Sequence, residues 1–423
     1  MREIGTYLKY MTMQKKITQE QLSNGICTPS YLSRIENNLI SADVEIYTLL
    51  FEKLGLSYKE IIKENDALEQ RLEDWYKHMF FYKESREDIQ ELRELCETAR
   101  PNTAIMFEIV YCRYLILNHE LEAAKDKIIE IKKLNLTSNN NRNYFLFINV
   151  LMLFYYARKE YQRAIEVGTR EIDIKTLNTV AFDYEIGAYH YNLAINYKNM
   201  YMYGECNHHS GMALDIFRDG YYLEQAIDCH ILLGISFNNL GKREESLDAY
   251  LKAKRLLNYL SDKYNNYYLG MIEHNIGYCY QRSGEYKKAI HSYENSLNHK
   301  KSNEKLLTLI NLIQCYYSIG EKNISKKLLL QALELANTKT PKLQQLHLDF
   351  LRNILLEESL SKDQIRELEH IFIEFINLKL QDAVIYYGEV LARILEGLHY
   401  YKKANNIYKT MVKAESELYE YAF

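Results

Sequence analysis

The chain contains two stretches in the same register, LGISFNNLGKREESLDAYLKA at residues 233–253 and IGYCYQRSGEYKKAIHSYENS at residues 276–296. Both begin with an apolar residue and a glycine. An aromatic residue, a second glycine, a small residue, a tyrosine and another small residue then follow, with the same spacing in the two stretches. The positions are Leu233, Gly234, Phe237, Gly241, Ser246, Tyr250 and Ala253 in the first stretch and Ile276, Gly277, Tyr280, Gly284, Ala289, Tyr293 and Ser296 in the second. Small residues let two antiparallel helices approach closely, the aromatic residues fill the space between hairpins, and the second glycine permits the turn. The two stretches therefore predict tandem helical hairpins.

The pattern recurs at a spacing of about forty residues and resembles the tetratricopeptide repeat, whose helices here are longer than usual. Weaker copies are found at Leu193, Ala194, Tyr197 and Ala213, at Leu312, Tyr316, Gly320, Ser325 and Ala332, at Leu391, Ala392, Ala404 and Tyr408, and earlier at Cys112 with Ala124 and at Met152, Tyr155 and Ala164. From Pro341 to about Leu380 the periodicity is amphipathic without a clean match, which predicts a degenerate helix pair before a terminal capping pair. The resemblance implies a right-handed tetratricopeptide-repeat solenoid.

The composition agrees with an all-α protein. Of 423 residues, 16 are glycine and 3 are proline, 47% are hydrophobic and 26% are charged. So few turn-forming residues disfavour turn-rich β architectures, while the hydrophobic content supports a large core. The sequence contains no apolar run long enough to span a membrane and no secretory signal, and its seven cysteines form no C-x-x-C pair. We therefore expect a cytoplasmic protein with reduced thiols.

A second motif lies near the amino terminus, where residues 18–37 read TQEQLSNGICTPSYLSRIEN. Thr18 and Gln21 match a capping box that begins a short helix, Gly25 permits a turn, and Thr28 with Pro29 begins the next helix. The inward-facing residues are predicted to be Leu22, Ile26, Leu32 and Ile35. The motif resembles the Xre and phage-repressor class of helix-turn-helix, in which the second helix presents polar side chains and an arginine to DNA bases.

The predicted DNA-binding residues are Gln19, Thr28, Ser30, Tyr31, Ser33, Arg34 and Asn37. Two alternatives stay open: Arg34 forms a surface ion pair with Glu36 or Glu20, and Gln19 and Ser30 serve only as helix caps. Residues 1–66 contain eight basic and nine acidic side chains. Because one near-neutral head neutralises few phosphates, we expect two heads to bind DNA together.

The repeat register also predicts a ligand groove on the concave face of the solenoid. Asn192, Asn275 and Asn311 occupy the same slot, two positions before the small-residue site of each repeat. An asparagine amide both donates and accepts, so such a ladder suits the main chain of an extended peptide. The remaining predicted peptide-binding residues are Arg113, Asn238, Asn239, Tyr278, Gln281, Arg282 and Gln314. The alternative is that the asparagines cap or bridge neighbouring hairpins.

No phosphate-binding glycine loop, zinc-protease motif or nucleophile elbow occurs in the sequence. His119 and Glu120 begin a zinc-protease motif, but Ala123 stands where its second histidine belongs. The sequence therefore predicts no catalytic residue, metal site or cofactor, and a protein that is not an enzyme.

The Xre-type head and the long repeat body together resemble the peptide-responsive quorum-sensing regulators of Gram-positive bacteria, the Rap, Rgg, NprR, PlcR and PrgX family. The body length is most similar to that of NprR. The implied domains are a DNA-binding head at 1–66, a helical linker at 67–75 that begins near Lys63, and a peptide-sensing and oligomerisation domain at 76–423. The resemblance implies a transcription regulator that binds an imported signalling oligopeptide and double-stranded DNA as a homodimer or homotetramer. A Rap-like inhibitor or phosphatase of a sporulation phosphorelay response regulator is the alternative.

Overall fold

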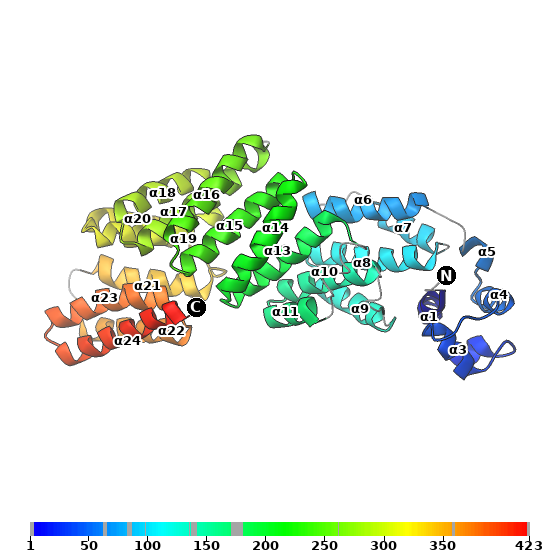
Figure 1. The fold of residues 1–423 in the computed structure, drawn as a ribbon. Helices are drawn as coiled ribbons and strands as arrows, with labels where there is room; N and C mark the ends of the chain where they lie inside the picture. Colours follow the sequence, from blue (N-terminus) through cyan, green and yellow to red (C-terminus); the bar gives the residue numbers. More distant parts are fainter. Residues whose placement is uncertain are drawn as a thin grey trace. The chain divides into compact units, whose positions relative to one another are not determined.

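The computed structural model describes residues 4–61, 66–82, 87–97, 99–134, 136, 142–170, 181–260, 262–357 and 360–420, and their regular structure is helical (Figure 1). The amino-terminal helices are α1 (Ile4–Gln14), α2 (Gln19–Ser23), α3 (Pro29–Glu36), α4 (Val44–Lys53), α5 (Tyr58–Ile61), α6 (Asp66–Tyr82) and α7 (Ile89–Cys96). Next come α8 (Pro101–Leu117), α9 (Leu121–Lys132), α10 (Arg142–Ala157), α11 (Tyr161–Arg170), α13 (Asp183–Asn199), α14 (Tyr203–Asp219), α15 (Leu223–Asn239) and α16 (Arg243–Leu256). The last are α17 (Asp262–Arg282), α18 (Tyr286–His299), α19 (Leu306–Ser318), α20 (Lys322–Leu335), α21 (Lys342–Leu356), α22 (Lys362–Asn377), α23 (Gln381–Gly397) and α24 (Tyr401–Glu420), with short 3-10 turns at Leu257–Tyr259 and Ser302–Glu304.

The head consists of α1 to α5 around one core. Leu22, Leu32 and Ile35 are fully buried in it and Ile26 is partly buried, as the sequence predicts. Ala104, at the start of α8, belongs to the same core. The first helix is therefore packed against the first repeat helix as well as against its own domain, and the hydroxyl of Tyr10 donates a hydrogen bond to the Glu108 carboxylate of α8.

The body is built from antiparallel helix pairs, and the turn within each pair confirms the predicted register. Seven residues after each predicted small position the backbone has a positive φ. These residues are His119 (63°), Lys159 (60°), Tyr201 (60°), Gly241 (71°), Gly284 (72°), Gly320 (88°) and His399 (63°). Left-handed backbone costs an ordinary residue about 1–2 kcal/mol, so glycine is favoured there without being required.

The small residues of the two strongest repeats are explained by close helix contacts. A Cβ atom on Gly234 would lie 2.3 Å from Cε1 of Tyr250, and one on Gly277 would lie 2.7 Å from Cδ1 of Tyr293. The tyrosine sixteen positions later thus fills the space that the missing side chain leaves. The predicted all-α fold, a helix-turn-helix domain followed by tetratricopeptide-like hairpins, is confirmed.

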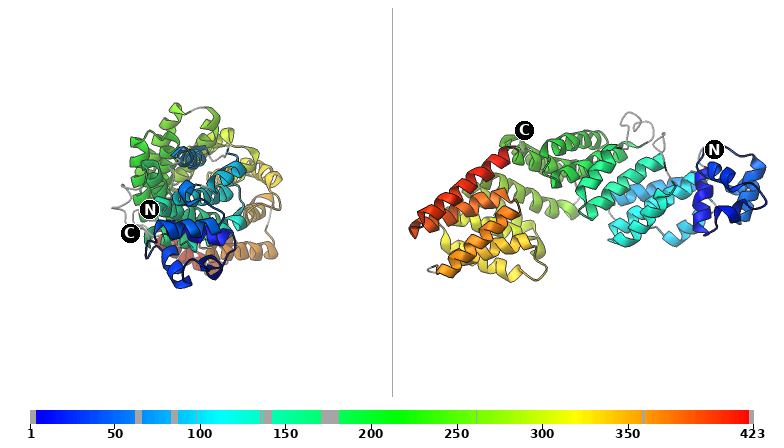
Figure 2. Two further views of the ribbon diagram at one scale, coloured as in Figure 1. Left: turned by 90° about the vertical axis from the view of Figure 1, so that its right-hand side faces the viewer. Right: turned by 90° about the horizontal axis from the view of Figure 1, so that it is seen from below.

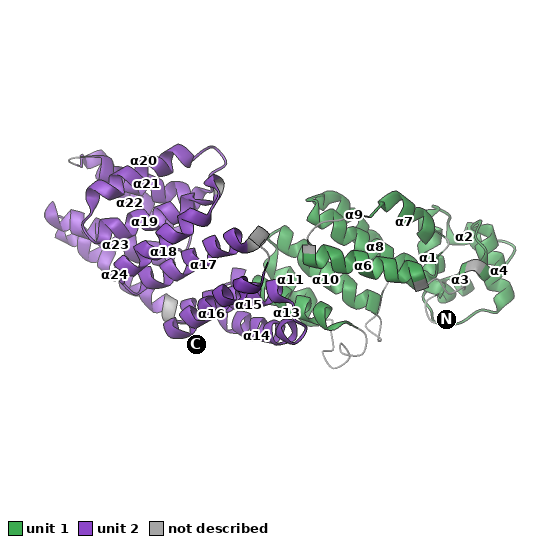
Figure 3. Cartoon of the chain, turned by 90° about the horizontal axis from the view of Figure 1, so that it is seen from above, with its two compact units in different colours: residues 1–196 green, residues 197–423 purple. Residues whose placement is uncertain are grey.

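The chain forms two compact units, residues 1–196 and residues 197–423 (Figure 3). Figure 2 shows from two further sides how helix pairs stack within them. The proposed domain limits at 66 and 75 remain a prediction, and Lys63, where the linker was expected to begin, lies outside the described residues.

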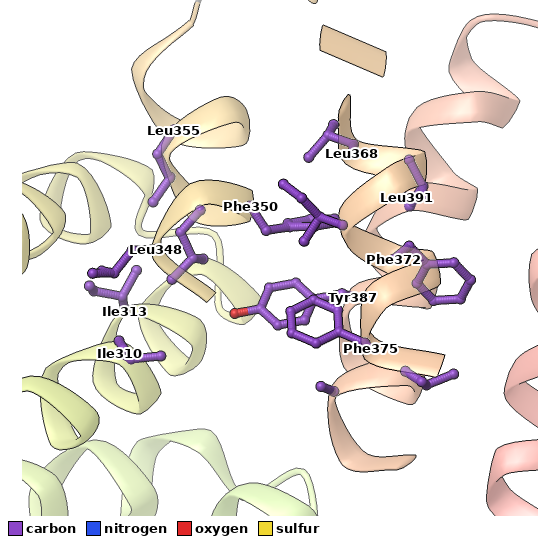
Figure 4. Close-up of a cluster of buried hydrophobic side chains, with 14 of the residues drawn as sticks. Ile310, Ile313, Leu348, Phe350, Leu355, Leu368, Phe372, Phe375, Tyr387 and Leu391 are labelled. Atoms are coloured by element: carbon purple, nitrogen blue, oxygen red, sulfur yellow. The ribbon is translucent and has the colours of Figure 1, made fainter. Parts of the chain in front are cut away.

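The carboxy-terminal part of the second unit has its own apolar core, to which α19, α21, α22 and α23 contribute (Figure 4). At its centre the ring of Tyr387 stacks on Phe375 with 5.0 Å between centroids and contacts Phe350 at 4.4 Å. The degenerate pair predicted near residues 341–380 is present as α21 and α22. Among the described residues, no helix is both long and apolar enough to cross a membrane.

Candidate functional site

The predicted DNA-reading surface lies on α3 and the turn before it. Thr18 caps α2 with a complete capping box, and the Thr28 hydroxyl accepts a hydrogen bond from the backbone N–H of Tyr31 at the start of α3. Ser30 and Arg34 are exposed, while Tyr31 and Ser33 are half-buried. The polar face of α3 is therefore open to solvent at Ser30 and Arg34.

Two of the open alternatives can now be compared with the structure. The exposed guanidinium of Arg34 has no ion pair with any described residue, so the surface pairing with Glu36 or Glu20 is not formed. The Gln19 amide donates to the carboxylate of Glu36 at 2.5 Å, which links α2 to α3. Glu36 is 2% exposed, and burial raises the pKa of its carboxyl group. Gln19 therefore has a structural partner within the motif, and it does not act as a cap.

Asn37 ends α3 and holds its own turn together. Its side-chain amide donates to the Ser33 carbonyl at 2.8 Å, and its side-chain oxygen accepts a hydrogen bond from Lys9 at 3.2 Å. The side chain is nevertheless exposed.

A cavity of about 900 Å³ opens within the second unit. Its lining residues come from α14 to α19 and from α21, α23 and α24, and they include both polar and apolar side chains. Eight of the ten predicted peptide-binding residues line it, namely Asn238, Asn239, Asn275, Tyr278, Gln281, Arg282, Asn311 and Gln314. Further lining tyrosines are Tyr201, Tyr203, Tyr250, Tyr286 and Tyr386. The wall combines amides, which pair with peptide groups, and phenol rings, which offer apolar area with a polar end.

A chain of directed hydrogen bonds crosses the wall of the cavity. Tyr293 donates to the side-chain oxygen of Gln281 at 2.6 Å, and the Gln281 amide donates to Gln314 at 2.8 Å. The Gln314 amide donates to the Tyr387 hydroxyl at 2.8 Å, and that hydroxyl pairs with Nδ1 of His347 at 2.9 Å. The two glutamines therefore bridge helices of the second unit, which is the role that was the alternative for the asparagines of this groove.

The three asparagines of the shared slot differ in their surroundings. The Asn311 amide donates to the Tyr293 hydroxyl at 3.3 Å, so this asparagine bridges helices. The Asn275 side chain is half-buried in the cavity wall and makes no hydrogen bond with any described residue. Asn192 lies in the first unit, where its amide is 3.5 Å from the side-chain oxygen of Asn149. Asn275 is the member of the ladder whose donor and acceptor are both available in the cavity.

Arg282 and Tyr278 meet a residue that the sequence did not single out. The Tyr278 hydroxyl donates to the carboxylate of Asp382 at the start of α23, and the Nε atom of Arg282 lies 3.3 Å from the same carboxylate. Arg282 also donates to the backbone carbonyl of Asn238 at 2.8 Å. Burial, followed by the nearby carboxylate, raises the pKa of Tyr278 far above its usual value, so the phenol stays a donor.

Two further lining side chains, His274 and His347, are neutral at physiological pH. Burial lowers their pKa values to about 3 and about 4 respectively. Arg243, the other arginine in the wall, is ion-paired with Glu285. The other positive charges of the cavity wall are Arg282 and the exposed Lys379.

Arg113, the expected groove cation, lies in the first unit. It is 7% exposed, and its guanidinium stacks over the rings of Tyr76 at 4.9 Å and Phe80 at 5.8 Å, both on α6. The Nε atom of Arg113 is buried without a hydrogen-bond partner among the described residues. Its side chain is thus covered by α6.

Asn239 is the last predicted residue, and its amide donates to the Ile235 carbonyl of its own helix at 2.8 Å. Asp382 and His347 are among the cavity residues that sequence reasoning missed. They lie outside the clean repeats, and no signal in the local sequence places them opposite α17 and α19.

Comparisons with known proteins agree with this architecture. A helix-turn-helix family model matches residues 8–61. Over 404 residues the chain is 28% identical to the transcriptional activator NprA of Geobacillus stearothermophilus, covering 92% of this chain and 97% of that protein. The apo form of RapI has a TM-score of 0.65 at 17% identity, covering 84% of this chain and 99% of RapI. The apo form of the quorum sensor NprR from B. thuringiensis has a TM-score of 0.64 at 20% identity, covering 83% of this chain and 99% of NprR. NprR in complex with its cognate peptide NprX has a TM-score of 0.55 at 20% identity, covering 82% of this chain and 99% of that one.

The head, the repeats and the cavity define a helix-turn-helix protein with a tetratricopeptide-like body. The resemblance to the NprR and Rap proteins that the sequence predicted is confirmed: the chain is similar in sequence to NprA and shares its fold with NprR and RapI.

Proposed function

We propose that the chain is a transcription regulator whose DNA binding is controlled by an oligopeptide held in the cavity of residues 197–423. The observation that carries the proposal is the lining of that cavity. Amide side chains from equivalent repeat positions face an opening of about 900 Å³, and Asn275 offers a donor and an acceptor that the fold does not use. Amide side chains can form hydrogen bonds with the main chain of a ligand, and tyrosine rings lie beside them, which suits an extended peptide.

The DNA-binding part of the proposal rests on the head. The polar face of α3 carries an exposed Arg34 with no ion pair to any described residue, and the helix-turn-helix family match covers this segment. Because residues 1–66 are nearly neutral overall, specific affinity requires two heads on one duplex. We assign DNA binding to residues 1–66, a linker to 67–75, and peptide sensing with self-association to 76–423, in a protein that acts in the cytoplasm.

The similar proteins support the same assignment. NprA is a transcriptional activator, and NprR is a quorum sensor that has been crystallised with its peptide NprX. The sequence match to NprA spans both the head and the body of this chain. A peptide-controlled regulator accounts for both parts.

The test couples the two parts in one titration. Duplexes are selected from a random-sequence pool on the full chain, peptides are selected from a random heptapeptide mixture, and DNA affinity is measured at fixed salt with and without saturating peptide. Allosteric coupling of ordinary size would change the DNA dissociation constant about fivefold or more. An identical dissociation constant with peptide bound, or failure to select any specific duplex, would contradict the proposal.

A further inference from the structure

The contact between α17 and the start of α23 joins residues that are 104 positions apart in the sequence. Asp382 accepts a hydrogen bond from the Tyr278 hydroxyl and pairs with Arg282. All three side chains line the cavity. A carboxylate of the chain itself therefore lies against one of the positive charges of the cavity in which we place the peptide.

Arg282 needs an anion at this point. Its side chain is 20% exposed, and the hydrogen bond that it donates goes to a neutral carbonyl, that of Asn238. A guanidinium that is largely withdrawn from water and left without a counter-ion is strongly unfavourable. Any ligand that fills this part of the cavity must therefore leave Asp382 in place or bring a carboxylate of its own.

The pairing with Asp382 is open to replacement. Arg282 meets it through one 3.3 Å contact from Nε, and the Asp382 side chain is 38% exposed. A carboxylate that approaches a guanidinium side-on forms two parallel charge-assisted hydrogen bonds, which are stronger than one end-on contact. A ligand carboxylate delivered from within the cavity can adopt that approach and also accept the Tyr278 hydrogen bond.

We propose that Arg282 and Tyr278 form an anion subsite, that Asp382 fills it in the absence of ligand, and that a side-chain or terminal carboxylate of the peptide replaces Asp382. This inference rests on the proposed peptide binding and adds the chemical class of the group recognised. Replacement releases the first turn of α23 from α17, so the ligand is linked to the terminal helix pair α23 and α24. The hydrogen bonds between Gln314 and Tyr386 and Tyr387, farther along α23, do not involve the subsite.

The experiment starts from peptides with free carboxyl ends. A synthetic random heptapeptide mixture is incubated with the full chain, and the bound peptides are identified by mass spectrometry. Each recovered peptide is then remade with its carboxylates changed one at a time to carboxamides, and all forms are titrated into wild type, Asp382→Asn and Asp363→Asn. Asp363 is the matched control, because it also lies in the first turn of a helix, α22, and is ion-paired with Arg366 at an exposed site.

One carboxamide replacement is expected to weaken binding to wild type by about tenfold or more, the usual effect of losing a charge-assisted hydrogen bond. Asp382→Asn removes the internal competitor and should bind the acidic peptide about tenfold more tightly, while Asp363→Asn should match wild type. Hydrogen exchange of residues 381–387 should speed up when the acidic peptide binds.

Three results would overturn the inference. If no carboxamide replacement matters, or if Asp382→Asn binds the acidic peptide no more tightly than wild type, Asp382 is a structural clamp and peptide binding itself still stands. If no peptide is recovered at all, the proposed function of the cavity fails together with the subsite.

Discussion

Replacing Asn275 by alanine removes an amide that lines the cavity but contributes no hydrogen bond to any described residue. The side chain is half-buried in the middle of α17, where alanine is the better helix former by about 0.5 kcal/mol. We therefore expect the free energy of unfolding to change by less than about 0.5 kcal/mol, as for substitutions that remove no packed or paired group.

Peptide binding should respond very differently. If the Asn275 amide pairs with the peptide main chain, Asn275→Ala leaves a peptide N–H or C=O buried without a partner, which costs about 1–3 kcal/mol for each group. That loss corresponds to a dissociation constant about fivefold to more than hundredfold larger. Calorimetric titration of a library-selected peptide, beside a melting curve of each protein, measures both effects.

Asn311→Ala is the matched comparison, because this asparagine occupies the same slot and is used by the fold. Its amide donates to the Tyr293 hydroxyl, so the variant should lose about 1 kcal/mol of stability. The reasoning is refuted if Asn275→Ala melts at a lower temperature while its peptide affinity stays at the wild-type value. Such a result would mean that the asparagines of this repeat position stabilise the fold and do not bind the peptide.

Three further outcomes are expected. Arg34→Ala should weaken specific DNA binding by about 1–3 kcal/mol without lowering the melting temperature, and an unchanged gel-shift titration at fixed salt would remove Arg34 from the interface. Gly277→Ala should destabilise the chain by about 1–3 kcal/mol, because the new Cβ would lie 2.7 Å from a tyrosine ring. Gly211→Ala, in the middle of a helix with open space around it, should be neutral or stabilising, so equal melting curves for the two variants would contradict the packing argument. His274 and His347 are held neutral by pKa values of about 3 and about 4, so the folded chain binds fewer protons than the unfolded chain as pH falls from about 6.5, and stability drops over that window. Between pH 7 and pH 5, His347→Gln should lose about 2 kcal/mol less of its free energy of unfolding than the wild type does, as measured by urea unfolding.

The fold was predictable because its repeat pattern is local. The small residue, the turn and the facing tyrosine of one hairpin lie within about twenty residues, so spacing alone aligns them. Gly241 and Gly284 mark their turns directly. His119, Lys159 and Tyr201 adopt the same left-handed backbone without glycine, and they are recognised through the register alone.

The candidate site was predictable in part, for the same reason. Residues of the shared repeat slots, such as Asn275 and Gln314, follow from the register. Asp382 and His347 reach the cavity through contacts between hairpins that are far apart in the sequence, and no periodic signal encodes which hairpins meet. Arg113 has the register of a groove cation, but α6 packs over it, which depends on tertiary contacts outside the repeat.

Photo-crosslinking of a selected peptide to the full chain tests the central claim most directly. A benzophenone is placed at successive peptide positions, and the crosslinked residues are mapped by mass spectrometry. Peptide binding in the cavity predicts crosslinks to α17, α19 and the start of α23, and their loss in Asn275→Ala at the same peptide concentration. Crosslinks confined to helices that do not line the cavity, unchanged in that variant, would contradict the account.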